Sequence, residues 1–506
     1  MASPTDDAKS PSPVSTPERR ERGGKPRAHA ATVSSRRAVG DVIVQIVGQV
    51  LNLVLGIFVT ALIARSLGTT GFGEWTTIFS VSTLVGYFTN LGLSGVAVRF
   101  AASEPEREAD WIGGYATLTA ALTLPAMVVY ALIMQAISTT QEMRIASLIL
   151  ALAYLSGVLA TFSTIFRMRV RNDISIAFVS ANSVLWAASV VVIATQNGGM
   201  VALAAAFLAV SVLIQGTQAL FAMRIAPVHI RGSRRMWRPI MRVGMGVGLG
   251  TLLTVAYARI DQVLVFELAP KRSEAGIYGA VYRILDTAGF VPTAVMTTLF
   301  PIISAAYPSD LSRVRRLLQL AMDYLAMLSL PTLAFSLSAS EPLIRLMFGP
   351  DFVEGAEALP ILMAAYVVIC FGYISGNMII PTELQRRYVN FAIVGLIVNV
   401  GLNLVLIPQY GYIAAAWITL LTNVIVVFPA LYTVLHKLEM RVSLWRLLRT
   451  TVAAAVGGGV VALLHSAGVP LAGLIGAMVL TYPLALLALR ALDIQELRGV
   501  LRERGG

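Results

Sequence analysis

Apolar runs long enough to cross a membrane recur along nearly the whole chain. About 20 apolar residues span the hydrocarbon core of a bilayer as an α-helix. Segments of about ten residues with alternating polarity, which mark a membrane β-barrel, are not found. The pattern predicts an all-α polytopic membrane protein with about 14 transmembrane helices. These helices are expected at residues 41–65, 74–98, 111–136, 145–166, 174–195, 200–223, 239–267, 275–304, 317–338, 357–380, 388–407, 411–435, 447–465 and 470–490.

Four of the predicted helices carry polar residues at helical spacing. A period near 3.6 places each set on one helix face. A single polar residue can be explained by interhelical hydrogen bonding, worth about 0.6 kcal/mol on average. Four such faces together indicate a shared polar cavity. The sets are Asp41, Gln45, Gln49, Asn52, Gly56 and Thr60; Thr76, Ser80, Thr83, Tyr87, Asn90 and Ser94; Thr251, Thr254, Tyr257 and Asp261; and Gly276, Gly279, Arg283 and Asp286.

Charged residues inside the seventh and eighth predicted helices mark the same region. Ionised groups at membrane depth cost roughly 2.5–3.5 kcal/mol each on insertion scales, so they usually face water or a partner. Arg283 and Asp286 are three residues apart, and an ion pair within one helix is an alternative to substrate binding for Arg283. Arg259 and Asp261 are two apart and point to different faces, which makes a local pair between them unfavourable.

Glycine and proline predict irregularities in the same two helices. The run VGMGVGLG, residues 243–250, has glycine at every second position, and four glycines weaken a helix. We expect the seventh helix to bend or unwind there. Pro292 and Pro301 are expected to kink the eighth helix.

The pattern of the first two helices recurs later in the chain. GFGEWTTIFSV from Gly71 and EAGIYGAVYRI from Glu274 both open a helix, and Gly73 aligns with Gly276 at an offset of 203 residues. Parallel halves around a cavity are a common transporter plan. The expected organisation is a disordered basic cytoplasmic tail, two six-helix bundles, two further transmembrane helices and a cytoplasmic tail. Their bounds are 1–38, 39–225, 236–436, 446–490 and 491–506.

Composition and charge agree with this organisation and exclude several functions. The chain is 57% hydrophobic and 13% charged, with a mean hydropathy of +0.75. The net charge is +12, and the Lys and Arg residues lie mostly in short loops between the predicted helices. This distribution argues against nucleic-acid binding and predicts that both termini are cytoplasmic. The single cysteine, Cys370, cannot form an intrachain disulfide, and the four histidines lack metal-ligand spacing. No catalytic residue, metal or cofactor is predicted. The basic residues expected on the outer side are Arg65, Arg144, Lys271, Arg272 and Arg345.

Several stretches resemble polysaccharide flippases of the Wzx type, within the superfamily that also contains MATE exporters and MurJ lipid II flippases. The resemblance is collinear and covers roughly Asp41 to Leu435. It implies a V-shaped pair of six-helix bundles that work by alternating access. The stretches are ARSLGTTGFGEW from Ala64, NLGLSGVAVRFAA from Asn90, RIDQVLVFELAPKRSEAGIYGAVYRI from Arg259, EPLIRLMFGPDFVEGAEAL from Glu341 and LIPQYGYIAAAW from Leu406.

The resemblance implies a substrate made of an oligosaccharide on a polyprenyl (pyro)phosphate, moved from the inner to the outer leaflet of a bacterial cytoplasmic membrane. The partners expected are membrane lipids and other polysaccharide-assembly proteins. Arginine forks bind phosphate oxygens bidentately, which favours Arg259 and Arg283 as phosphate ligands. Hydroxyl, amide and aromatic groups suit sugars. The candidates for sugar contact are Gln49, Asn52, Tyr87, Asn90, Tyr257 and Tyr282.

The driving force is left open by the sequence. An inside-negative potential favours outward movement of an anion, by about 2.3 kcal/mol per charge per 100 mV. A proton or sodium ion coupled through Asp41, Asp261 or Asp286 is the other route.

Two other functions are alternatives to a flippase. An ion-coupled MATE-like exporter of small cations would favour a more acidic cavity, and two arginines with two aspartates leave that comparison even. A membrane glycan polymerase or ligase would need a large outer loop with acid–base groups. The longest predicted outer loop, residues 339–356, contains no histidine or cysteine.

Overall fold

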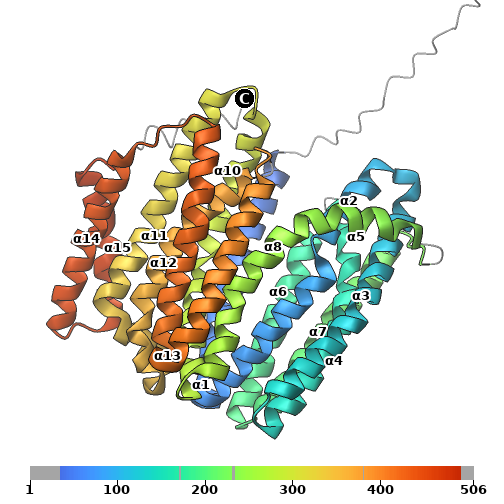
Figure 1. Cartoon of the computed structure of the whole chain (residues 1–506), viewed down its shortest axis with the longest axis horizontal. Helices are drawn as coiled ribbons and strands as arrows, with labels where there is room; N and C mark the ends of the chain where they lie inside the picture. Colours follow the sequence, from blue (N-terminus) through green and yellow to red (C-terminus); the bar gives the residue numbers. More distant parts are fainter. Residues whose placement is uncertain (1–34, 170–171, 231–233, 380, 492–506) are drawn as a thin grey trace, which may run out of the picture. The chain divides into compact units, whose positions relative to one another are not determined.

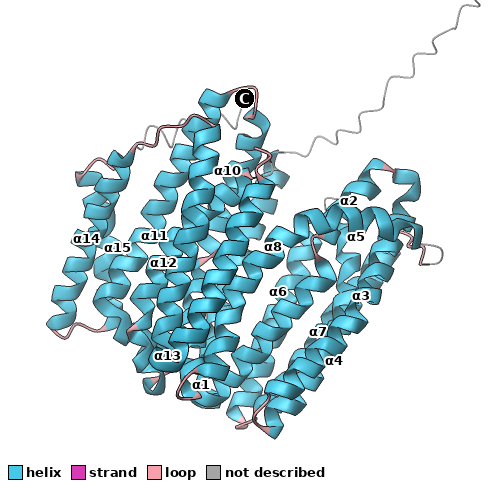
Figure 2. Cartoon of the chain, in the orientation of Figure 1, coloured by secondary structure: helices cyan, strands magenta, loops and turns pink. Residues whose placement is uncertain are grey.

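The chain is described by a computed structural model, which places residues 35–169, 172–230, 234–379 and 381–491. Regular structure in these residues is helical throughout, without a strand (Figure 2). A helix satisfies its backbone hydrogen bonds internally, as a bilayer requires. The helices are α1 (Ser35–Asn90), α2 (Leu93–Ser103), α3 (Glu108–Ile137), α4 (Gln141–Ala160), α5 (Thr164–Met168), α6 (Asn172–Thr195), α7 (Met200–Ile225), α8 (Arg234–Leu268), α9 (Ser273–Ala288), α10 (Phe290–Ala306), α11 (Leu311–Phe348), α12 (Ala358–Met378), α13 (Gln385–Lys437), α14 (Leu444–Ser466) and α15 (Leu471–Ala488).

Met1–Val44 and Gln45–Gly506 form two separate units. The first contributes the beginning of α1, and the account below concerns the second. The predicted tails at 1–38 and 491–506 fall almost entirely outside the described residues.

Twelve helices of the described chain are long and apolar enough to cross a membrane, and two of them are 53 residues long. Each long one contains a glycine with non-helical dihedrals, Gly68 (φ 67°, ψ −179°) in α1 and Gly411 (φ 59°, ψ −146°) in α13. This backbone region is essentially restricted to glycine. Each glycine therefore divides one long helix into two spans, and the prediction of 14 transmembrane helices is confirmed.

The expected irregularities of the seventh and eighth spans have mixed outcomes. α8 is one continuous helix through residues 243–250, so the prediction of unwinding is wrong, although the α8 ribbon does bend along its length (Figure 1). Two of its glycines serve close packing instead, because a Cβ on Gly244 would lie 2.5 Å from Leu93 Cδ2 and one on Gly248 would lie 2.4 Å from the carbonyl oxygen of Leu91. The eighth span is interrupted only at Gly289 between α9 and α10, three residues before Pro292, and Gly289 itself keeps helical dihedrals (φ −58°, ψ −14°). α10 continues through Pro301.

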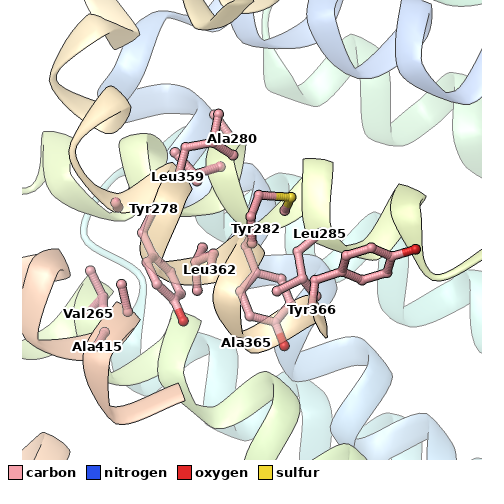
Figure 3. Packing of buried hydrophobic residues seen from close by; sticks show 14 of the residues in the cluster. Val265, Tyr278, Ala280, Tyr282, Leu285, Leu359, Leu362, Ala365, Tyr366 and Ala415 are labelled. Carbon is pink, nitrogen blue, oxygen red and sulfur yellow. The ribbon is translucent and has the colours of Figure 1, made fainter. Parts of the chain in front are cut away.

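Helix ends and apolar packing hold these spans in place. Thr140 caps α4 by accepting from the Met143 backbone N–H at 3.1 Å, and Asp310 caps α11 by accepting from Arg313 N–H at 2.9 Å. The largest buried cluster joins α1, α9, α12 and α13, and Figure 3 shows its members around Tyr278, Tyr282 and Tyr366. The last two helices, α14 and α15, pack on α11 through a separate apolar cluster.

Candidate functional site

A cavity of about 420 Å³ lies between α1, α6, α7, α8 and α9. Three of the four predicted polar faces contribute most of its polar wall, from both halves of α1 and from α9. α8 contributes Arg259 and Gln262. The lining side chains with a polar atom are Asn52, Thr60, Trp75, Thr76, Ser80, Thr83, Asn182, Ser183, Trp186, Arg259, Gln262, Tyr278, Tyr282, Arg283 and Asp286.

Part of this wall was missed by the sequence reasoning. Asn182, Ser183 and Trp186 of α6 lie in a predicted helix that we did not connect with the cavity. The available signal was an adjacent Asn–Ser pair with a tryptophan one turn later, in an otherwise apolar span. Phe207 of α7 gave no signal, since an aromatic residue in an apolar helix is indistinguishable from core or lipid-facing residues.

Arg259 and Asp286 form a bidentate ion pair between α8 and α9. The Nη1–Oδ2 and Nη2–Oδ1 distances are 2.8 and 3.2 Å. The guanidinium carbon of Arg259 also lies 5.6 Å from the centre of the Tyr282 ring, whose hydroxyl donates to the Ala258 carbonyl at 2.7 Å. Arg259, expected as a phosphate ligand, is thus neutralised by Asp286, the carboxylate that the sequence offers as an alternative partner of Arg283.

Arg283 is left as the cation available at the cavity wall. Its side chain is exposed, and within the described residues its guanidinium makes no hydrogen bond or ion pair. It also lines an adjoining space of about 460 Å³, together with Asn52, Asp286 and Tyr373. Because Asp286 is engaged by Arg259, the three charged residues of the cavity sum to one positive charge, centred on Arg283.

Asp261 lies away from this cavity, 1% exposed, in a polar cluster between α8, α9 and α13. It accepts hydrogen bonds from Asn403 Nδ2 at 2.8 Å, Thr419 Oγ1 at 2.7 Å and Tyr278 OH at 3.4 Å. No basic side chain of the described chain pairs with it. The Oδ1 atom of Asn403 is buried without a partner, so the cluster has spare capacity to accept.

The remaining predicted residues are not all at the cavity. Tyr257 is buried and lines a different space. Gln49 and Asn90 are exposed and Tyr87 is half-buried, and none of the three lines the cavity. Tyr87 and Asn90 keep the helical period of Thr76, Ser80 and Thr83, so they share that face but lie one to two turns beyond its cavity-lining part. Gln49 likewise lies about one turn before Asn52, the first residue of α1 at the cavity. The Asp41 side chain lies outside the described part of the chain.

The arrangement is that of a transporter. Membrane-spanning helices of two sequence repeats surround a polar cavity, and no group of three or more His, Cys, Asp and Glu side chains suited to a metal occurs within the described residues.

The fold is shared with solved transporters. A lipid II flippase MurJ in an inward closed conformation superposes with a TM-score of 0.69, at 15% identity over 88% of this chain and 98% of that one. An inward-facing MATE multidrug transporter gives 0.62, at 16% identity over 78% and 94%.

Residues 38–306 match the family model described as polysaccharide biosynthesis protein, and the chain belongs to this family. A probable flippase, AglR, of Haloferax volcanii is 28% identical over 178 residues, which are 34% of this chain. The match spans 37% of that relative's length. The expected resemblance, the all-α fold and the transporter class, as opposed to an enzyme, are confirmed.

Proposed function

We propose that this protein is a flippase for an oligosaccharide linked to a polyprenyl (pyro)phosphate. It carries the glycan from the inner to the outer leaflet of the cytoplasmic membrane by alternating access, for cell-surface polysaccharide biosynthesis. The physical task is to move sugar and phosphate through about 30 Å of hydrocarbon. A polar cavity shared by the two halves lowers that barrier while the lipid tail stays in the membrane.

The observation that carries this proposal is the unpaired guanidinium of Arg283 in the cavity. An unpaired guanidinium attracts phosphate oxygens and can bind them bidentately. The flippase name of the AglR relative and the family description support the same substrate class. A MATE-like exporter of cations is the alternative, and the net positive charge of the cavity disfavours it.

Coupling to an ion is best assigned to Asp261. This carboxylate is buried without a counter-cation among the described residues, beside the unsatisfied Oδ1 of Asn403. An intramembrane carboxylate in such a setting is a candidate for a proton or a sodium ion. Asp286 is less suited, because Arg259 already neutralises it.

The orientation follows the distribution of basic residues, with both termini in the cytoplasm. The bundles are proposed at 39–225 and 236–436, followed by two accessory spans within 446–490. The resemblance in sequence implies a bacterial cytoplasmic membrane, whereas the similar flippase AglR comes from the archaeon Haloferax volcanii.

The test is made in cells of the protein's own source. Outer-leaflet glycans are oxidised with membrane-impermeant periodate, and the oxidised fraction of extracted lipid-linked glycan is measured. Loss of the protein should leave these glycans unoxidised and accumulated, and the intact gene should restore oxidation. Equal oxidation with and without the protein would overturn the proposal.

A further inference from the structure

A second cavity, of about 370 Å³, lies inside the second repeat between α8, α9, α12 and α13. This volume falls in the range of about 300–1,000 Å³ typical of ligand pockets. Five tyrosines from these four helices line it. They are Tyr257, Tyr282, Tyr366, Tyr373 and Tyr388.

Three of these rings are fixed by their hydroxyls. Tyr366 donates to the Ala288 carbonyl at 3.0 Å, and the Tyr388 and Thr254 hydroxyls share a hydrogen bond at 3.1 Å. Tyr282 is held through Ala258. In Figure 3 the rings of Tyr282 and Tyr366 flank Leu285, which also lines this space. Tyr257, Tyr282 and Tyr366 are 7%, 8% and 1% exposed, so they form the fixed wall of the cavity. The rings open to a ligand are those of Tyr373 and Tyr388, which are half-buried.

The polar groups among these rings are uncharged, apart from Asp286. They include the side-chain amides of Asn377 and Asn423 and the hydroxyl of Ser375. No lysine, arginine or histidine of the described residues lines the cavity, and Asp286 is occupied by Arg259. A phosphate would find no counter-charge here. An uncharged, hydroxyl-rich ligand with apolar faces fits, because its C–H faces stack on aromatic rings and its hydroxyls bind amides.

The two cavities are neighbours. Tyr282 and Asp286 line both of them, so the Arg259–Asp286 pair and the Tyr282 ring form their partition. We propose that the tyrosine-lined cavity is a second subsite, which holds a neutral sugar ring of the glycan while the phosphate stays beside Arg283. This inference rests on the flippase function proposed above and adds a separate place for the saccharide.

Gly376 allows the cavity to be filled without a backbone clash. It lines the cavity, and a Cβ built on it would meet nothing within 4 Å. Gly376→Leu would place a side chain in the space and replace an unfavourable residue of α12 by a good helix former. Gly401→Leu in α13 is the matched control, since Gly401 also has open space but lines neither cavity.

The test measures saturation-transfer NMR from the purified full-length protein to glucose, galactose, mannose and N-acetylglucosamine, each alone. We expect transfer to the ring protons of at least one sugar. It should fall at least fivefold in Gly376→Leu and stay unchanged in Gly401→Leu and in Arg283→Ala. Absence of transfer from all four sugars, or equal transfer to Gly376→Leu, would overturn the subsite.

The periodate assay separates this inference from the function on which it rests. Gly376→Leu should lower glycan reaching the outer leaflet at least tenfold, and Gly401→Leu should not. Full transport by Gly376→Leu would remove the subsite and leave the flippase in place. Sugar binding at the cavity by a protein without any effect on glycan location would remove the flippase and leave the subsite.

Discussion

Gly73 and Gly276, equivalent residues of the two repeats, lie in backbone contact with each other. A Cβ added to Gly73 would lie 2.8 Å from the Gly276 nitrogen, and one added to Gly276 would lie 1.8 Å from the carbonyl oxygen of Thr69. Equivalent residues touch where a pseudo-two-fold axis passes between them. This seam joins α1 to α9 beside the cavity, at the end that the charge distribution assigns to the outer side.

The seam predicts that Gly276 does not tolerate even a methyl group. Gly276→Ala forces backbone apart, and overpacking of this kind costs about 1–3 kcal/mol. We expect a lower thermal midpoint in detergent and reduced transport. Gly401→Ala, where a Cβ meets nothing within 4 Å, is the control and should be neutral. Equal midpoints for the two variants would show that the seam is looser than described.

The glycine breaks of α1 and α13 are predicted to differ in cost. In Gly68→Ala the added Cβ meets no atom within 4 Å, so the only cost is the backbone strain of a φ of +67°, about 1–3 kcal/mol. Gly411→Ala, at a φ of +59°, has a similar backbone strain, and its Cβ would also lie 1.8 Å from Glu274 Oε2. That carboxylate accepts from the Tyr412 backbone N–H at 3.0 Å. Thermal unfolding should therefore rank Gly411→Ala below Gly68→Ala, and the reverse order would contradict this assignment.

The ion pair between α8 and α9 is expected to show energetic coupling. Both side chains are partly exposed, 30% for Arg259 and 23% for Asp286, so we expect a coupling of about 1–2 kcal/mol. A double-mutant cycle of Arg259→Met and Asp286→Leu, followed by denaturant unfolding, measures it. If the effects of the two substitutions on the free energy of unfolding simply add, the coupling free energy between Arg259 and Asp286 is zero.

The proposed ion site at Asp261 predicts how transport depends on an ion gradient. Asp261→Asn keeps the size of the side chain and its hydrogen bonding to Asn403 or Thr419, while it removes the charge. Transport should lose its dependence on a sodium or proton gradient, whichever the wild type shows. Asp351→Asn, an exposed carboxylate outside the cavity, should keep the dependence. An unchanged gradient dependence in Asp261→Asn would place the coupling ion elsewhere.

The spans and their number were predictable from the sequence, because burial in lipid imposes long apolar runs. The partner of Asp286 was not, since sequence spacing shows which residues share a helix face but not how α8 and α9 rotate against each other. The role of α6 was hidden for the same reason. The glycine run of α8 was expected to bend or unwind the helix, and only the unwinding is wrong. Glycine also serves close packing, here of Gly248 against Leu91.

The central claim is that a positive charge at residue 283 binds the phosphate of the substrate. Arg283→Cys tests it directly, because Cys370 is the chain's other cysteine and is fully buried. The variant is treated with either an aminoethyl or an ethyl methanethiosulfonate, which differ in charge at similar size. Arg144→Cys, on an exposed residue outside the cavity, is the labelling control.

The measurement is the oxidised fraction of lipid-linked glycan in cells with each variant, before and after labelling. We expect Arg283→Cys to transport at least tenfold more slowly than wild type, with substantial recovery after the aminoethyl reagent and none after the ethyl reagent. Wild-type transport by unlabelled Arg283→Cys, or equal recovery with the neutral reagent, would contradict the claim.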